Sequence, residues 1–196
     1  LEPDLLQFIP RPVTAVVFLF PVTEKYEQSR REEEERIRKE GQTVSKDLYF
    51  VRQTIGNACG TIGLLHALAN NTEVLQLGDG ALKHILEKTK AISPDDRAGF
   101  LEDDKDLASV HEASSQEGQT AASSAEQDVD THFVCFVQRD GNIYELDGRK
   151  PFPINHGPSS DLLLDAAEVI KTFIARDPDQ LNFTVIALAP KQEEED

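Results

Sequence analysis

Cys59 is the residue whose type and surroundings are best suited to covalent chemistry. It follows the turn-forming segment Gly56-Asn57-Ala58 and begins an apolar run that predicts a buried helix over 59–69. A helix N-terminus presents unpaired N–H groups and a partial positive charge, which favour a thiolate over a thiol. The second cysteine, Cys135, lies in a strand-like pattern of Phe and Val residues, so we expect it to serve packing.

A thiolate nucleophile needs a nearby base, and the base needs a third group that fixes its tautomer and stabilises the imidazolium. His132 and Asp147 can supply this pair, because they lie near the open end of a hairpin predicted for 131–138 and 142–147. We expect them at about the same level on adjacent strands, within hydrogen-bonding reach. The alternative is a polar pair that only caps the end of a sheet.

The remaining histidines are less suited to act as the base. His66 and His84 fall in predicted helices, His111 in a predicted loop, and His156 in a Pro- and Gly-rich loop. Acyl transfer also needs donors for the tetrahedral oxyanion. The side-chain amide of Gln53 and the backbone N–H of Cys59 are candidates, although Gln53 by itself would be read as a surface glutamine.

The elements that must position these residues alternate between helix and strand. The pattern predicts a buried strand over 14–20, a charged helix over 23–40 and a strand or extended segment over 47–53. After the helix that Cys59 begins, it predicts helices over 81–90 and 161–176, the hairpin, and a strand over 181–189. Residues 109–125 contain Val110 as their only large aliphatic residue and predict a mobile loop. The order indicates an α+β or α/β layered fold.

Composition narrows the class of partner. The formal net charge is −16 and the pI about 4.6, which disfavours nucleic acid. Residues 92–130 hold eleven acidic and two basic residues, a local charge of −9 that could solvate the chain or attract a basic ligand. No apolar run approaches the length of a membrane span. With only two cysteines, a disulfide framework is not expected, which favours a reducing compartment. We expect a monomer that is located in the cytoplasm, and in the nucleus as well, and that uses no metal or cofactor.

The segment from Gln53 to Leu64, Gln-Thr-Ile-Gly-Asn-Ala-Cys-Gly-Thr-Ile-Gly-Leu, resembles the nucleophile segment of ubiquitin C-terminal hydrolases. Other segments look like this family in the same order along the chain: Pro10–Val13, Phe20–Tyr26, Glu117–Thr120, Glu145–Gly157 and Arg176–Asp179. The resemblance covers nearly the whole chain and is closest to the short, single-domain members.

The resemblance implies a papain-like α+β fold with a mostly antiparallel sheet flanked by helices, a crossover loop over the active site and a knotted backbone. It implies that Cys59 attacks the carbonyl after the last glycine of ubiquitin and forms a thioester, with His132 as base, Asp147 as its partner and Gln53 as oxyanion donor. The crossover loop maps onto 109–130. Such a loop admits slender substrates, so small or disordered adducts of ubiquitin, and also of Nedd8, are the expected substrates.

The resemblance also divides the chain into one catalytic domain over 1–190 and an acidic tail over 191–196. Family members carry a few dozen residues, with a helix and a strand, before the segment that Leu1 begins. Two other interpretations stay open. One is a non-catalytic ubiquitin-binding module, either because this difference impairs the site or because binding is its role. The other is an unrelated Cys-His-Asp amidase that acts on small molecules.

Overall fold

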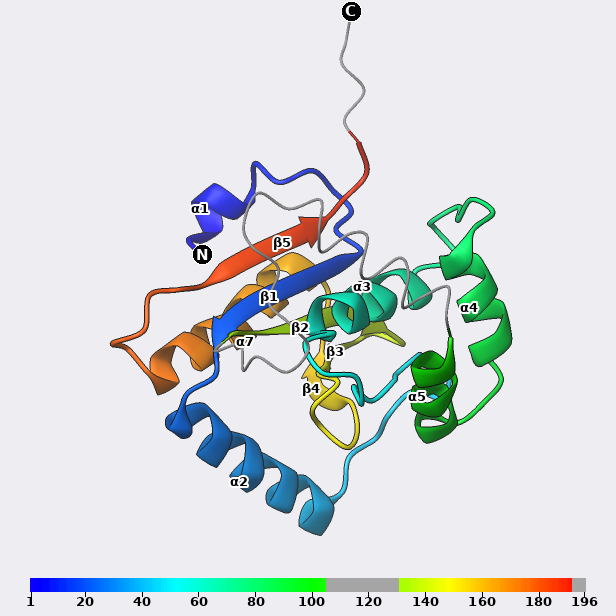
Figure 1. Ribbon diagram of the computed structural model, residues 1–196. Helices are drawn as coiled ribbons and strands as arrows, with labels where there is room; N and C mark the ends of the chain where they lie inside the picture. The colour runs from blue at the N-terminus through cyan, green and yellow to red at the C-terminus, as the bar shows by residue number, and fades with distance from the viewer. Residues whose placement is uncertain (105–130, 192–196) are drawn as a thin grey trace, which may run out of the picture.

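The computed structural model describes residues 1–104 and 131–191. Within these ranges five strands form one antiparallel sheet in the order β4-β3-β2-β1-β5 (Figure 1). The strands are β1 (Ala15–Pro21), β2 (Thr131–Arg139), β3 (Asn142–Leu146), β4 (Ile154–Pro158) and β5 (Thr184–Leu188). The β-branched and aromatic residues of β1 suit its place between β2 and β5, where both faces of the strand are covered.

The predicted hairpin is β2 and β3. Its turn residues Asp140 and Gly141 both have positive φ, 49° and 71°, as an Asp-Gly turn between two twisted strands requires. The last paired residues are Cys135 and Leu146. Asp147 therefore follows the ladder and lies diagonally across from His132, rather than at the same level as we predicted.

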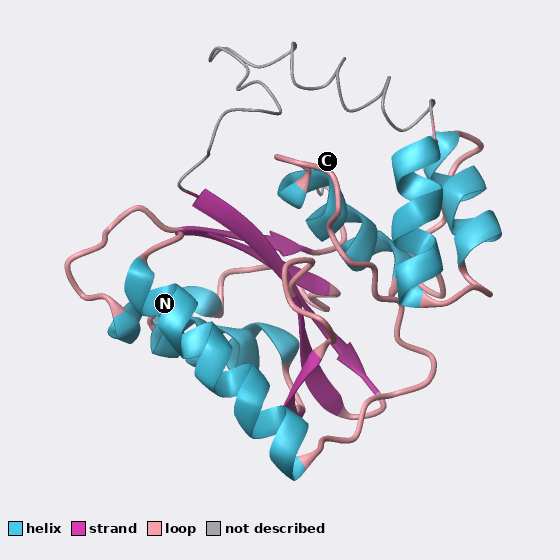
Figure 2. Ribbon diagram, turned by 60° about the horizontal axis from the view of Figure 1, so that its bottom comes forward, coloured by secondary structure: helices cyan, strands magenta, loops and turns pink. Residues whose placement is uncertain are grey.

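Helices cover both faces of the sheet (Figure 2). On one face α7 (Leu162–Arg176) buries Ala166 and Ile170 against Phe18 and Phe136. On the other face α3 (Cys59–Ala69) lies over β2 and β1 and is buried on most sides, as its apolar sequence predicts. The cysteine-bearing helix is thus fixed by the sheet that carries His132.

Two further helices, α4 (Ala81–Thr89) and α5 (Pro94–Asp103), pack against α3 in a separate apolar cluster. The sequence analysis missed α5, although Ser93 caps it and Pro94 occupies its first turn, both typical of a helix start. The charged helix α2 (Glu24–Glu40) begins at the cap Thr23, and α1 (Pro3–Leu6) is a single turn.

Residues 47–53 form an extended segment without strand pairing. Side chains of α3 satisfy its backbone instead: Tyr49 N donates to Asn70 Oδ1 at 2.8 Å and Val51 N to His66 Nε2 at 3.1 Å. His66 and Asn70 are buried by this contact, so they have a structural role. The segment delivers Gln53 to the end of the sheet, where its N–H donates to Gly148 O at 2.8 Å.

Some predictions about the fold were wrong, and others concern residues that the structure does not describe. The region of His156 is strand β4, not a loop, and β5 is shorter than the predicted 181–189. The predicted mobile loop, the crossover loop and the acidic tail lie outside the described residues except for Lys191. The expected knot stays a prediction, because the path of the chain includes those residues. The α+β class with a mainly antiparallel sheet is confirmed.

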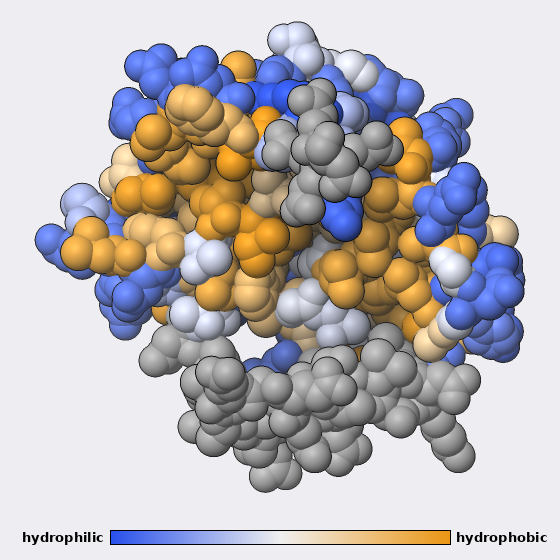
Figure 3. All heavy atoms as spheres, turned by 90° about the horizontal axis from the view of Figure 1, so that it is seen from above, coloured by the Kyte–Doolittle hydropathy of each residue, from blue (hydrophilic) through white to orange (hydrophobic). Residues whose placement is uncertain are grey.

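No helix in the described part of the chain has the length and apolar content that a membrane crossing requires. Apolar side chains are nevertheless exposed on the face that Figure 3 shows. Among the described residues, the large apolar side chains with the greatest exposure are those of Phe8 and Leu181, at 76% and 85%.

Candidate active site

The thiol of Cys59 lies at the first residue of α3 and hydrogen-bonds to the imidazole of His132. Burial would raise the pKa of this half-buried thiol, but the bond to His132 and backbone hydrogen bonds of Phe133 and Gly60 outweigh burial and lower the pKa below its ordinary value. The predicted nucleophile and base are therefore in contact.

The second bond of the array joins His132 to Asp147. His132 Nε2 lies 2.6 Å from Asp147 Oδ1, and the two residues are 3% and 0% exposed. Burial disfavours the imidazolium, but the hydrogen bonds to Asp147 and Cys59 more than compensate and raise the pKa of His132 to about 9. Burial would likewise raise the pKa of Asp147, yet the contact with His132 holds it well below its usual value.

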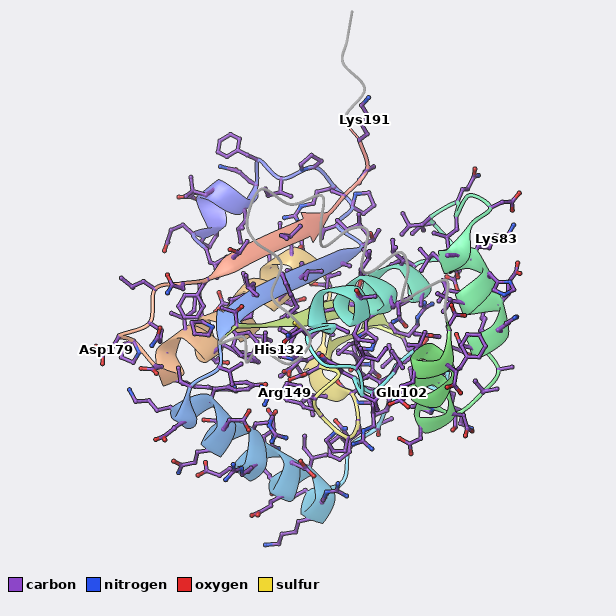
Figure 4. The ribbon with its side chains drawn as sticks, in the orientation of Figure 1. Lys83, Glu102, His132, Arg149, Asp179 and Lys191 are labelled. Atoms are coloured by element: carbon purple, nitrogen blue, oxygen red, sulfur yellow. The ribbon has the colours of Figure 1, made fainter. Side chains whose placement is uncertain are left out.

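The bond to Asp147 engages Nε2, which leaves Nδ1 as the ring nitrogen that can exchange a proton with the thiol. Figure 4 labels His132, on β2, and Arg149, on the loop after β3. The backbone N–H of Arg149 donates to Asp147 Oδ1 at 2.8 Å, so this oxygen accepts two hydrogen bonds. Together they fix the carboxylate plane against the ring.

Tyr26 is a member of the site that the sequence analysis missed. Its hydroxyl donates to Asp147 Oδ2 at 2.8 Å, and the ring is buried against Phe20 and Phe173. Burial and the neighbouring charge of Asp147 raise the pKa of Tyr26 well above its ordinary value, so the hydroxyl stays a donor. The only signal in the sequence was its place in the segment Phe20–Tyr26 that resembles the family.

Gln53 lies beside the residue that follows Asp147. Its Nε2 donates to Ile55 O at 3.1 Å, which folds the amide over its own loop. Gly148 packs so closely that a Cβ at this position would lie 2.9 Å from Gln53 Cβ and 3.1 Å from Gln53 N. Glycine is therefore required sterically where the loop of Asp147 meets the segment of Gln53.

A buried ionic cluster adjoins the site. Lys150 Nζ lies 2.6 Å from both Glu33 and Glu145, and Glu145 also lies 2.9 Å from His156 Nε2. Burial would raise the pKa of Glu145, but the charge of Lys150 and the bond to His156 lower it to about 2. The positive charge of Lys150 also contributes to the low pKa of Asp147.

The second cysteine and the histidine inside α3 are both held in their uncharged forms. Cys135 is fully buried, and burial raises the pKa of its thiol well above the ordinary value. Burial lowers the pKa of His66 to about 4, so the ring stays neutral between Val51 and Leu146. In the described ranges no group of three His, Cys, Asp or Glu residues is placed to hold a metal ion.

Comparison with known proteins finds relatives that cover nearly the whole chain. A sequence model of ubiquitin carboxyl-terminal hydrolase, family 1, matches residues 1–175. A ubiquitin carboxyl-terminal hydrolase of Drosophila melanogaster is 49% identical over 195 residues, which cover 98% of this chain and 85% of the relative. Isozyme L1 of Equus caballus is 44% identical over 191 residues, covering 96% of this chain and 83% of the relative.

Among solved structures, the chain is similar in fold to the catalytic domain of Trichinella spiralis UCH37, which is bound there to ubiquitin vinyl methyl ester. The TM-score is 0.69 at 23% identity, and the match covers 95% of this chain and 81% of that chain. Identity this low supports the fold alone, whereas the family match spans most of the sequence. The chain therefore belongs to the ubiquitin carboxyl-terminal hydrolases of family 1, which are cysteine peptidases.

Proposed function

We propose that this chain hydrolyses the bond between the C-terminal glycine of ubiquitin and small or disordered adducts, with Cys59 as the nucleophile. One observation supports this most: His132 contacts the thiol at the start of α3 and also bonds to the buried carboxylate of Asp147 at 2.6 Å. That arrangement stabilises a thiolate and provides a proton carrier, which are the two requirements of acyl transfer to sulfur.

The reaction would proceed in two steps. The Cys59 thiolate attacks the carbonyl carbon, and the tetrahedral intermediate collapses to a thioester as the imidazolium of His132 gives its proton to the leaving amine. Water then attacks the thioester while His132 takes a proton from the water, and the thiolate leaves. Asp147 stays ionised throughout and holds the ring in place. The products are ubiquitin with a free C-terminal carboxylate and the enzyme with its Cys59 thiolate restored.

The oxyanion of each tetrahedral intermediate needs donors. The backbone N–H of Cys59 at the helix start is one, and the side-chain amide of Gln53 is the other. In the present structure one Gln53 N–H donates to Ile55 O, so the second N–H of the same amide would serve the oxyanion. The contact between Gly148 and Gln53 holds this segment against the loop that carries Asp147.

Kinetics with two fluorogenic substrates would test the proposal. We expect hydrolysis of ubiquitin carrying a C-terminal fluorophore, and measuring the Nedd8 equivalent in parallel gives the preference between them. Cys59→Ala should reduce kcat by about 10⁴-fold or more. The control Cys135→Ala removes a buried thiol that has no catalytic role and should keep kcat.

Turnover that survives Cys59→Ala would refute the proposed nucleophile. Binding of ubiquitin without turnover by the unchanged chain would instead favour a ubiquitin-binding module.

A further inference from the structure

A second cavity lies at the opposite end of α3 from the candidate active site. Its volume is about 210 Å³, it is open to solvent, and it is lined by the end of α3, the segment before Phe50, the α4–α5 pair and the end of β2. Because α3 rises about 1.5 Å per residue, Ala69 in the cavity wall is about 15 Å along the helix from Cys59. The cavity is therefore separate from the proposed catalytic site.

The charge of this cavity is opposite to that of the whole chain. Four cationic side chains line it against two carboxylates, while the chain carries −16. The cations are Lys46, Lys90, Arg97 and Arg139, and the carboxylates are Asp47 and Glu73. Lys46 and Lys90 are exposed and form no ion pair with another described residue. A concave site with net positive charge concentrates anions.

Arg97 provides a buried positive charge in the cavity wall. The residue is 7% exposed, and its guanidinium donates to Thr89 O and Phe50 O at 2.8 Å and to Lys90 O at 3.0 Å. Within the described ranges no carboxylate pairs with it. The guanidinium carbon also lies 4.3 Å from the ring centroid of Tyr49. The carbonyls and this ring fix the group in position, and no carboxylate of the described residues neutralises its charge, which is unusual for a buried cation.

Arg139 contributes a donor that lacks a partner. Its buried Nε forms no hydrogen bond with the described residues. Its Nη1 lies 3.2 Å from Glu73, whose side chain is 78% exposed, so this ion pair is weak and easily exchanged. Its Nη2 donates to Asn70 O, which anchors the guanidinium at the cavity.

We propose that this cavity binds a phosphate monoester with a small apolar organic group. Arginine and lysine together form charge-assisted hydrogen bonds with phosphate oxygens. The apolar wall is formed by Leu48, Tyr49, Ala69 and Leu86. At about 30 Å³ for each liquid water molecule, the cavity volume corresponds to about seven water molecules. A phosphate has five heavy atoms, so the cavity has room for an attached group as well.

Titration of the whole chain with phenyl phosphate, followed by NMR chemical shifts, tests the proposal. We expect saturable binding that shifts amide signals of residues 46–49 and 86–97. The double variant Lys46→Ala/Lys90→Ala should weaken binding by about tenfold or more, as expected for the loss of two charged contacts. Lys83→Ala is the control, because Lys83 lies on α4, the helix that Lys90 follows, and pairs with Asp79 outside the residues that line the cavity.

Three uncharged or alternative probes make the outcome specific. Phenol should not bind, inorganic phosphate should bind more weakly than phenyl phosphate, and benzoate should bind more weakly as well. Absence of saturable binding, equal binding of phenol or benzoate, or affinity unchanged in the double lysine variant would each overturn the proposal. Lys46 and Lys90 lie outside α3, the helix that begins with Cys59. Hydrolysis of ubiquitin substrates by the unchanged chain is a separate measurement, and its failure would contradict the proposed function without affecting the proposal for this cavity.

Discussion

At the scale of single residues, the site depends on how one imidazole is shared. His132 bonds to Cys59 and to Asp147, and the pKa shifts of all three favour the charged forms. The raised pKa of His132, about 9, keeps the ring protonated at neutral pH, and the lowered pKa of Cys59 favours the thiolate. Both shifts act in the same direction, toward the thiolate and the imidazolium.

Asp147→Asn should change the pH dependence of this pair. In the unchanged chain we expect kcat/KM to fall at alkaline pH as His132 loses its proton near 9. Asparagine keeps the shape but removes the charge that raises the pKa of His132, so this alkaline limb should move to lower pH. The rate should also fall by up to about 10⁴-fold, because the tautomer is no longer fixed.

Rates of Cys59 alkylation by iodoacetamide across pH provide a check that does not depend on substrate. The thiolate should appear at higher pH in Asp147→Asn than in the unchanged chain, since its imidazolium partner is weaker. Asp179→Asn, which changes an exposed carboxylate, is the control. Identical pH profiles for the two variants would contradict the role of Asp147.

Gly148 offers a steric test of how Gln53 is positioned. Gly148→Ala adds a methyl group 2.9 Å from Gln53 Cβ and 3.1 Å from its backbone N, so the two segments must separate. We expect a loss of about 1–3 kcal/mol in the free energy of unfolding and a lower kcat. Gly78→Ala is the control, because no atom lies within 4 Å of the added Cβ. Equal stability and kcat in both variants would be inconsistent with close packing here.

The sequence predicted the contact among the proposed nucleophile, base and carboxylate better than the residues that position them. Cys59, His132 and Asp147 could be inferred because a helix start and a short hairpin place them by local rules. Tyr26 could not, since its bond to Asp147 joins residues 121 positions apart. The diagonal offset of His132 and Asp147 was also missed, because it depends on which pair ends the ladder.

At the scale of elements, α2 is tied to the loop after β3 by contacts that reach the site. Tyr26 bonds to Asp147, Glu27 pairs with Arg149 at 2.7 Å, and Glu33 pairs with Lys150 at 2.6 Å. The helix buries only Tyr26 and Ile37 in its whole length. Its attachment to the domain therefore depends largely on these polar contacts.

Lys150→Met should show the strength of this attachment. The substitution leaves Glu145 and Glu33 without their shared cation, and Glu145 is fully buried. Loss of one partner of a buried ion pair costs about 3–5 kcal/mol, which urea denaturation would measure. Adding Glu145→Gln should recover part of that loss.

Lys171→Met is the control for this experiment, because Lys171 pairs with Glu168 on the surface of α7. A loss in Lys150→Met no larger than in the control would show that the buried cluster does not stabilise the fold.

Strand β4 was not predicted from the sequence because contacts with a neighbouring strand determine its form. Strand β4 carries His156 and Gly157 in a Pro- and Gly-rich stretch whose pairing with β3 contains an irregular register. Its strand character comes from its neighbour, not from its own pattern. The extended segment before Gln53 likewise takes its form from His66 and Asn70 of α3, which supply hydrogen bonds that a neighbouring strand would otherwise provide.

At the scale of the whole molecule, the sheet, α3 and α7 form layers that bring the start of α3 to the end of the hairpin, and the chain carries a net charge of −16. If the substrate is ubiquitin, whose C-terminal tail is rich in arginine, this charge should accelerate association. We expect kcat/KM for the fluorogenic ubiquitin substrate to decrease as NaCl is raised from about 0.01 to 0.5 M. The kcat at saturating substrate should change less, and kcat/KM that rises with salt would contradict attraction of the substrate.

The most direct test of the account is covalent labelling with ubiquitin that carries an electrophile in place of its C-terminal carboxylate, followed by peptide mapping of the adduct. The proximity of His132 to the sulfur that begins α3 predicts a single adduct on Cys59, lost in Cys59→Ala and retained in Cys135→Ala. An adduct on Cys135, or a folded chain that binds the probe and forms no adduct, would contradict it.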